Sequence, residues 1–164
     1  MRAAVRILTT GGTFDKVHDW RTEQLDFAGE GQSEVPNILK NGRCDWPFLE
    51  HVFQLDSLDI TDEDRAFLAD RAAAASEARL VITHGTSTMA ETARYLAARH
   101  MPKTIVLTGA MRPHSLFVSD AAFNLGGALI AAQTLGHGVY VVMNGRIFAA
   151  EDVAKNVELG RFDA

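Results

Sequence analysis

The sequence is poor in several residue types that would commit it to a particular class of protein. Its 164 residues include one cysteine, four prolines and two tyrosines. The single cysteine, Cys44, has no partner for a disulfide within the chain, which fits a protein of the reducing cytoplasm. Basic residues are also few, since 16 lysines and arginines accompany 21 aspartates and glutamates and the formal net charge is −5. This balance argues against nucleic acid or an anionic membrane as the main partner.

Long hydrophobic runs are missing as well. No apolar stretch approaches the roughly 18 residues that a membrane span needs. The first residues, MRAAVRILTTGG, contain too few consecutive apolar residues for a secretory signal. We therefore expect a soluble, cytoplasmic protein.

Motifs for metals and nucleotides do not occur either. The sequence contains no H-E-x-x-H and no C-x-x-C, and its six histidines have no metal-ligand spacing. The glycine pair at 11–12 is not part of a G-x-G-x-x-G motif, which disfavours a nucleotide-binding Rossmann domain. A G-x-S-x-G motif is missing, which disfavours a Ser–His–Asp hydrolase. We expect neither a metal nor a cofactor.

What the sequence does contain is a regular alternation of strand and helix patterns. Five runs rich in β-branched and aliphatic residues predict strands with little polar alternation, as in parallel strands covered on both faces. These runs are 4–9, 51–55, 79–83, 104–108 and 138–143. Helical patterns follow at 62–76, 88–100 and 119–135. Their expected caps are Thr61 or Asp62, a T-x-x-E capping box of Thr88 and Glu91, and Ser119 or Asp120.

This alternation predicts one α/β domain over residues 1–164, a three-layer Rossmann-like (flavodoxin-like) fold with a mostly parallel sheet. Asn144-Gly145, between VYVVM and RIFAA, predicts a tight hairpin and thus a last, antiparallel strand. Residues 14–50 show no clear period. Because so long a loop usually binds a ligand, we expect an active-site loop at about 14–50.

Hydroxyl groups and glycines gather where the predicted strands end. They occupy 9–13 after the first strand, Ser57 after the second and 84–88 after the third. Ligands of open α/β sheets bind beyond these carboxyl ends, and free backbone amides there favour a small anion. Any one such threonine or serine is most often a cap or a turn former. The pattern alone therefore predicts a small-ligand α/β domain and no more.

Together these motifs resemble the bacterial L-asparaginases of the threonine-nucleophile type, also called asparaginase/glutaminases. The matching segments are TTGGTF (9–14), ITHGTSTMAETA (82–93), GAMRP (109–113), FNL (123–125) and VVMNGRIFAAEDVAK (141–155). The sequence resembles a short, single-domain form that lacks the family's C-terminal domain. Because longer relatives complete each site from a neighbouring subunit, the resemblance implies a homodimer or homotetramer.

The resemblance implies an amidohydrolase that converts L-asparagine, or a related ω-amide, to L-aspartate and ammonia. Thr13 would be the nucleophile, and Thr86 with Lys155 would activate it. A partly desolvated lysine can accept protons because its pKa is lowered. The substrate-binding residues implied are Gly12, Asp56, Ser57, Gly85 and Ser87. Backbone amides near Gly12, Thr86 and Ser87 would stabilise the oxyanion.

Three positions depart from the family pattern. Ser87 stands where the family has an aspartate that holds the substrate's α-ammonium group. No tyrosine lies within 14–50, so His18 either replaces the family's loop tyrosine as a base or is a solvated loop residue. Leu58 replaces a glutamine of the substrate clamp, whose function Lys16, Asp59 or Arg112 could take over. The alternative hypothesis is therefore a catalytically impaired pseudoenzyme or sensor that binds a small amino acid or dicarboxylate.

Overall fold

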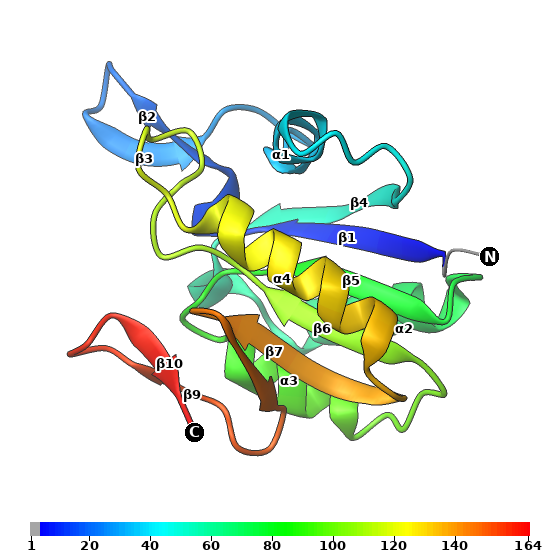
Figure 1. The fold of residues 1–164 in the computed structure, drawn as a ribbon. Coiled ribbons are helices and arrows are strands. Elements are labelled where there is room, and N and C mark those ends of the chain that lie inside the picture. The colour runs from blue at the N-terminus through cyan, green and yellow to red at the C-terminus, as the bar shows by residue number, and fades with distance from the viewer. Residues whose placement is uncertain (1–3) are drawn as a thin grey trace.

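A six-stranded sheet forms the centre of the protein, whose computed structural model describes residues 4–164 (Figure 1). Its order is β4-β1-β5-β6-β7-β8, and each neighbouring pair is parallel except the antiparallel pair of β7 and β8. The strands are β1 (Val5–Gly11), β4 (Phe48–Leu55), β5 (Arg79–Thr83), β6 (Thr104–Thr108), β7 (Gly138–Met143) and β8 (Arg146–Ala149). This arrangement confirms the predicted mostly parallel sheet and the hairpin at Asn144-Gly145.

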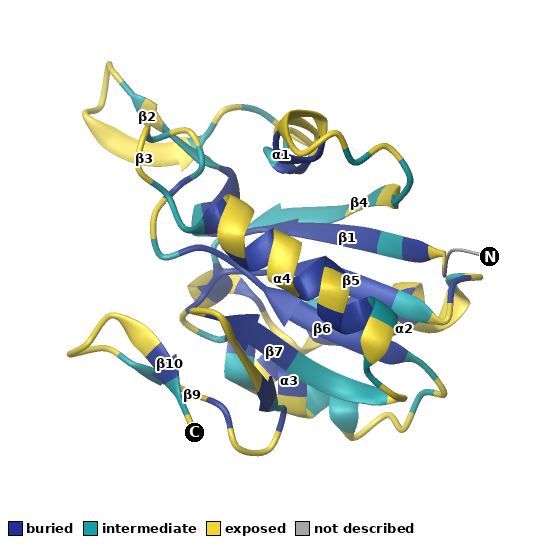
Figure 2. Ribbon diagram, in the orientation of Figure 1, coloured by how far each residue is buried: buried dark blue, intermediate teal, exposed yellow. Residues whose placement is uncertain are grey.

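Helices cover both faces of the sheet, which makes three layers (Figure 1). The helices α2 (Asp62–Ala74) and α3 (Met89–Ala97) lie on one face, and α1 (Val35–Asn41) and α4 (Ala121–Thr134) lie on the other. Successive residues of a strand point to opposite faces, so Leu8 packs with α2 and α3 while Ile7 packs with α1 and α4. The central strands are buried on both faces, as their unbroken apolar runs predict (Figure 2).

The helix caps follow the sequence in some places and not in others. Thr61 forms a reciprocal capping box with Asp64 at the start of α2. At α4, the Ala121 N–H donates to Ser119 Oγ at 3.0 Å. The capping box expected at Thr88 is wrong, because its hydroxyl donates to the Ser57 carbonyl oxygen at 2.7 Å instead of capping α3. The Thr88 side chain thus bonds to a residue distant in sequence and not to the first turn of its own helix.

The expected loop at about 14–50 contains regular structure. It begins with the 3₁₀ helix η1 (Thr13–Asp15) and continues as an antiparallel hairpin of β2 (Lys16–Asp19) and β3 (Gln24–Phe27). Helix α1 follows, and its buried side chains Val35, Ile38 and Leu39 have helical spacing. Seven residues with a proline in the first turn are too short a pattern to stand out in the sequence.

A second hairpin ends the chain. It consists of β9 (Ala154–Asn156) and β10 (Arg161–Asp163), and it is anchored by Phe162, which is 1% exposed in the core beside α3. Both hairpins extend beyond the same end of the sheet, where the parallel strands finish (Figure 1). Each can therefore add side chains to a site at that end.

Candidate active site

The order of the strands selects one position at this end of the sheet. The chain passes from β1 outward to β4 on one side and then returns to β5 on the other. Ligands of open α/β sheets bind at such a switch point, beyond the carboxyl ends of the two inner strands. Thr13 follows β1 and Thr86 follows β5, so the topology brings the two predicted hydroxyl residues to the same place.

Close contacts between glycines hold these two turns together. Gly12 has a φ of 74°, and a Cβ added to it would overlap the backbone of Gly85. A Cβ added to Gly85 would in turn overlap the Ser57 side chain. The turns after β1, β4 and β5 are therefore packed at backbone distance, and any side chain at Gly12 would be both strained and obstructed.

Lys155 joins this group from the C-terminal hairpin. Its Nζ lies 2.8 Å from the hydroxyl oxygen of Thr86, which is buried. In the hairpin Lys155 is the register partner of Phe162, whose N–H donates to the Asn144 side chain at 2.8 Å. A buried aromatic residue thus positions the lysine, which lies 69 residues from Thr86 in the sequence.

The ammonium group of Lys155 is partly removed from water. Desolvation lowers the pKa of Lys155, and the nearby carboxylate of Asp56 partly opposes this effect. A hydrogen bond from Lys16 is the main reason why the pKa of Asp56 is lowered, and this carboxylate also forms an ion pair with Lys16. Asp56 therefore lies in the field of two lysines, at the edge of the group.

Ser57 and Ser87 are linked through the backbone. The Ser87 N–H donates to the buried Ser57 hydroxyl at 3.2 Å, while the Ser87 residue itself is exposed. Of the clamp candidates, Lys16 contacts Asp56, whereas Asp59 and Arg112 are exposed. The structure thus packs Gly12, which directly precedes Thr13, against Gly85 and packs Gly85 against Ser57, while Lys155 contacts Thr86 and lies near Asp56.

His18 lies apart from these contacts. It belongs to β2, where it pairs in register with Leu25, and it is exposed. Among the hydrogen bonds of residues 4–164, none joins His18 to Thr13. Its role as a base stays a prediction.

A buried polar network under the third turn is not apparent in the sequence. Desolvation lowers the pKa of His84 to about 4, so its imidazole is neutral. Since a carbonyl oxygen only accepts, the His84 Nδ1 at 2.8 Å from the Gly85 oxygen is the protonated nitrogen. The other nitrogen then accepts from the Thr92 hydroxyl at 2.9 Å, and Thr92 accepts from Arg65 Nε at 3.2 Å. This chain of bonds supports the turn that carries Thr86.

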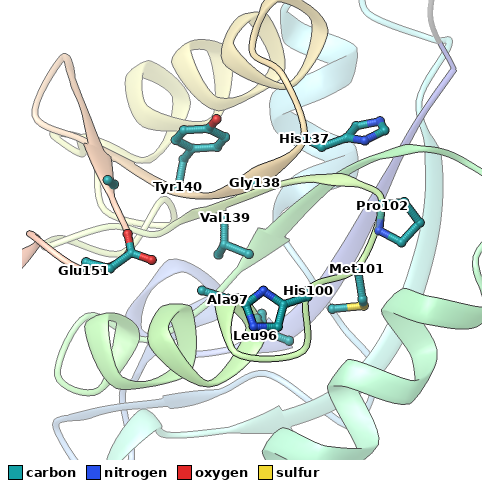
Figure 3. Close-up of a pocket in the computed structure, with 11 residues that line it drawn as sticks. Leu96, Ala97, His100, Met101, Pro102, His137, Gly138, Val139, Tyr140 and Glu151 are labelled. Carbon is teal, nitrogen blue, oxygen red and sulfur yellow. The ribbon is translucent and has the colours of Figure 1, made fainter.

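A cavity of about 510 Å³ adjoins the group. Its lining includes Lys16, Phe27, Asp56 and Leu58. A separate cavity of about 570 Å³ lies between α3 and the β7–β8 edge, where His100, His137 and Tyr140 surround it (Figure 3). That second cavity contains none of the predicted site residues. Within residues 4–164, no three histidine, cysteine or carboxylate side chains come together as metal ligands.

Comparisons of the sequence and of the structure with known proteins indicate the same family. Residues 4–164 match the family described as Asparaginase, N-terminal. A probable periplasmic L-asparaginase of Haemophilus influenzae is 34% identical over 172 residues, which cover 92% of this chain and 46% of that protein. The crystal structure of L-asparaginase I from Vibrio cholerae superposes with a TM-score of 0.84 at 27% identity, over 99% of this chain and 51% of the other.

A third relative is described as cytoplasmic, unlike the periplasmic protein of Haemophilus influenzae. The structure of a probable cytoplasmic L-asparaginase from Campylobacter jejuni gives a TM-score of 0.78 at 30% identity, over 98% of this chain and 52% of the other. The relatives thus include both periplasmic and cytoplasmic proteins. Within residues 4–164, no helix is long and apolar enough to span a bilayer. The chain covers about half the length of these relatives. The match over residues 4–164 shows that the chain belongs to the asparaginase family.

Proposed function

We propose that the protein is an amidohydrolase that converts L-asparagine, or a close ω-amide, to the carboxylate and ammonia through an acyl-enzyme on Thr13. The observation that carries this proposal is the contact of 2.8 Å between Lys155 Nζ and Thr86 Oγ1, next to the turn of Thr13. A threonine hydroxyl needs a neighbouring base to become an effective nucleophile. A lysine with a lowered pKa supplies one.

The reaction has two stages. In the first, Thr13 Oγ bonds to the amide carbon while its proton passes to the pair of Thr86 and Lys155. The carbon–nitrogen bond then breaks, and the leaving nitrogen takes a proton and departs as ammonia. In the second stage, water attacks the ester, which releases the carboxylic acid and restores the Thr13 hydroxyl. Of the backbone N–H groups expected to stabilise the oxyanion, those of Gly12 and Ser87 already donate to the Leu55 carbonyl oxygen and to the Ser57 hydroxyl, so the Thr86 N–H would have this role in both stages.

Substrate recognition is proposed to involve the turn after β4. The buried Ser57 would bind the α-carboxylate, and Asp56 lies beside it with Lys16 as its ionic partner. Ser87 provides a hydroxyl but no negative charge for the α-ammonium group. We therefore expect weak binding of the amino-acid part of the substrate.

Ammonia release from L-asparagine tests the proposal. The wild-type protein should release ammonia, and Thr13→Ala should abolish this release without a change in melting temperature. Thr22→Ala, at an exposed position of the β2–β3 turn, is the matched control and should keep full activity. If aspartate or asparagine raises the melting temperature of the wild type but no ammonia appears, the protein is a sensor and the proposal is wrong.

A further inference from the structure

Asp15 is a buried carboxylate that the proposed mechanism does not use. It lies in the same 3₁₀ helix as Thr13, and only 3% of its surface is exposed. Its Oδ1 accepts hydrogen bonds from the Ser33 hydroxyl at 2.8 Å and from the Glu34 N–H at 2.9 Å. Burying a carboxylate costs free energy unless hydrogen-bond donors replace its lost water, and these two donors do so for Asp15.

The two hydrogen bonds close a long excursion of the chain. We define the flap as residues 16–32, which contain the β2–β3 hairpin, whose second strand is mostly exposed (Figure 2). Asp15 immediately precedes the flap and Ser33 immediately follows it, so their bond joins the flap's two ends. The Ser33 oxygen also accepts from the Val35 N–H at 3.2 Å, at the start of α1. One carboxylate therefore connects the Thr13 turn, the base of the flap and a core helix.

The base of the flap has further attachments beside the candidate site. Lys16, the first flap residue, forms an ion pair with Asp56. Its carbonyl oxygen accepts from the Ser115 hydroxyl at 2.8 Å. Movement at the base of the flap would therefore be transmitted both to Thr13 and to the turn that contains Ser57.

We propose that Asp15 is a positioning residue whose hydrogen bonds to Ser33 and Glu34 hold both ends of the flap together and thereby fix the orientation of Thr13. We call these two hydrogen bonds the clasp. This inference rests on the proposed role of Thr13 as the nucleophile. Asp15 does not touch the substrate. It acts by fixing the position of the attacking Thr13 hydroxyl, because a displacement of about 1 Å can lower a rate about 100-fold.

Protonation should loosen the clasp. Burial raises the pKa of Asp15 to about 6; the donors from Glu34 and Ser33 oppose this effect, and the Glu34 charge adds to it. A polar cavity of about 340 Å³ lies against the carboxyl group, and its titratable lining residues are Asp15 and Glu34. Since the ionised carboxylate is the stronger acceptor, the clasp holds above about pH 6 and weakens below it.

Two measurements on the full chain test this role. The first is kcat and KM for ammonia release, and the second is trypsin cleavage after Arg21, an exposed flap residue. Asp15→Ala should lower kcat about tenfold or more with little change in KM, because nucleophile geometry is lost and binding is not. It should also speed the cleavage at Arg21. Ser33→Ala should change both quantities in the same direction by a smaller factor.

The control and the pH profile separate positioning from general destabilisation. Glu30→Gln alters an exposed carboxylate in the same flap, away from the cavity beside the candidate site, and it should leave both quantities unchanged. The wild-type kcat should rise through about pH 6, and Asp15→Asn should remove this step. Unchanged kcat in Asp15→Ala, or unchanged cleavage at Arg21, overturns the proposal.

Two further outcomes are also decisive. If Asp15→Ala does not fold, Ser33→Ala decides: faster cleavage at Arg21 supports the clasp, and wild-type cleavage overturns it. If the wild type releases no ammonia, the proposed function fails and the positioning role fails with it. The cleavage rates then show separately whether the clasp exists.

Discussion

The chemistry of a threonine or a lysine depends on the groups that surround it. Lys155 shows this most clearly, because an isolated lysine near the end of a hairpin is usually solvated. Here its Nζ contacts the buried Thr86 hydroxyl, and desolvation lowers its pKa. The same residue type at an exposed position such as Lys40 lacks these neighbours. The local environment, and not the residue type, makes Lys155 a candidate base.

We predict that Lys155→Met lowers kcat for ammonia release about 100-fold or more, which is the usual effect of losing a general base. In the wild type, kcat should increase with pH as the Lys155 amine loses its proton, and the variant should lack this dependence. Lys40→Met is the matched control and should behave as the wild type. A variant that retains wild-type kcat and its pH dependence would exclude Lys155 as the base.

The same substitution has a predictable effect on stability. Because folding lowers the pKa of Lys155, the unfolded chain binds this proton more tightly, so the residue's contribution to the free energy of unfolding increases with pH up to about 10.5. At neutral pH Lys155→Met should therefore not destabilise the protein, as urea unfolding would measure. A clear loss of stability would show that the amine contributes more to folding than its desolvation costs.

Ser87 provides a prediction about specificity. Ser87→Asp would add a carboxylate at an exposed position whose N–H bonds to Ser57. We expect KM for L-asparagine to fall about tenfold, because an opposite charge a few ångströms from the α-ammonium contributes more than 1 kcal/mol. Succinamic acid, which has the same amide but no α-ammonium, is the control substrate, and its KM should not fall. An unchanged KM for L-asparagine would remove position 87 from the α-ammonium site.

At the scale of elements, two hairpins supply the side chains that the parallel sheet lacks. The first carries Lys16 to Asp56, and the second carries Lys155 to Thr86. Each is anchored at its base: the first by Asp15, and the second by the buried ring of Phe162. The site should therefore be sensitive to substitutions that touch no substrate.

Phe162→Ala tests this dependence. The substitution removes a fully buried ring beside α3, and it should lower the free energy of unfolding by about 3–5 kcal/mol in urea denaturation. Ammonia release should fall in the fraction that stays folded, because Phe162 is the register partner of Lys155. Val157→Ala alters an exposed residue of the same hairpin and should have little effect on either quantity. Equal activity of the two variants per folded molecule would contradict this role of the hairpin.

The elements differ in how far the sequence could predict them. Long apolar runs and helical patterns gave the five parallel strands, helices α2, α3 and α4, and the Asn144-Gly145 hairpin, because each has a local signal of sufficient length. Helix α1 and strands β2, β3, β9 and β10 are three to seven residues long and depend on tertiary contacts. Thr88 does precede α3, but the side-chain bonds of its capping box were mispredicted for the same reason, since its hydroxyl donates to the distant Ser57.

At the scale of the whole molecule, the site combines segments that are far apart in the sequence. The resemblance of TGGT, HGT and AEDVAK to the asparaginases indicated Thr13, Thr86 and Lys155, but no periodicity could predict the contact of residues 86 and 155. Asp15 and Arg65 lie in no matching segment, and although His84 and Thr92 lie within 82–93, nothing in that segment indicates their bonds to each other and to Arg65. Buried polar partners of this kind become visible only when the chain is folded.

We also expect the protein to assemble as a homodimer or homotetramer. Helix α4 has no charged residue, and its exposed face includes Phe123 and Ile130. Exposed apolar surface of this kind is typical of interaction sites. Light scattering at several protein concentrations should give a mass of two or four chains. A monomeric mass at all concentrations would contradict the expectation.

The most direct test of the account is a double-mutant cycle for kcat on Thr86→Val and Lys155→Met. If the two residues activate Thr13 as one unit, each single variant should lose most of the activity, and the double variant should be only slightly slower than the slower single variant. If the two losses multiply in the double variant, or if either single variant keeps wild-type kcat, Thr86 and Lys155 do not act together on Thr13.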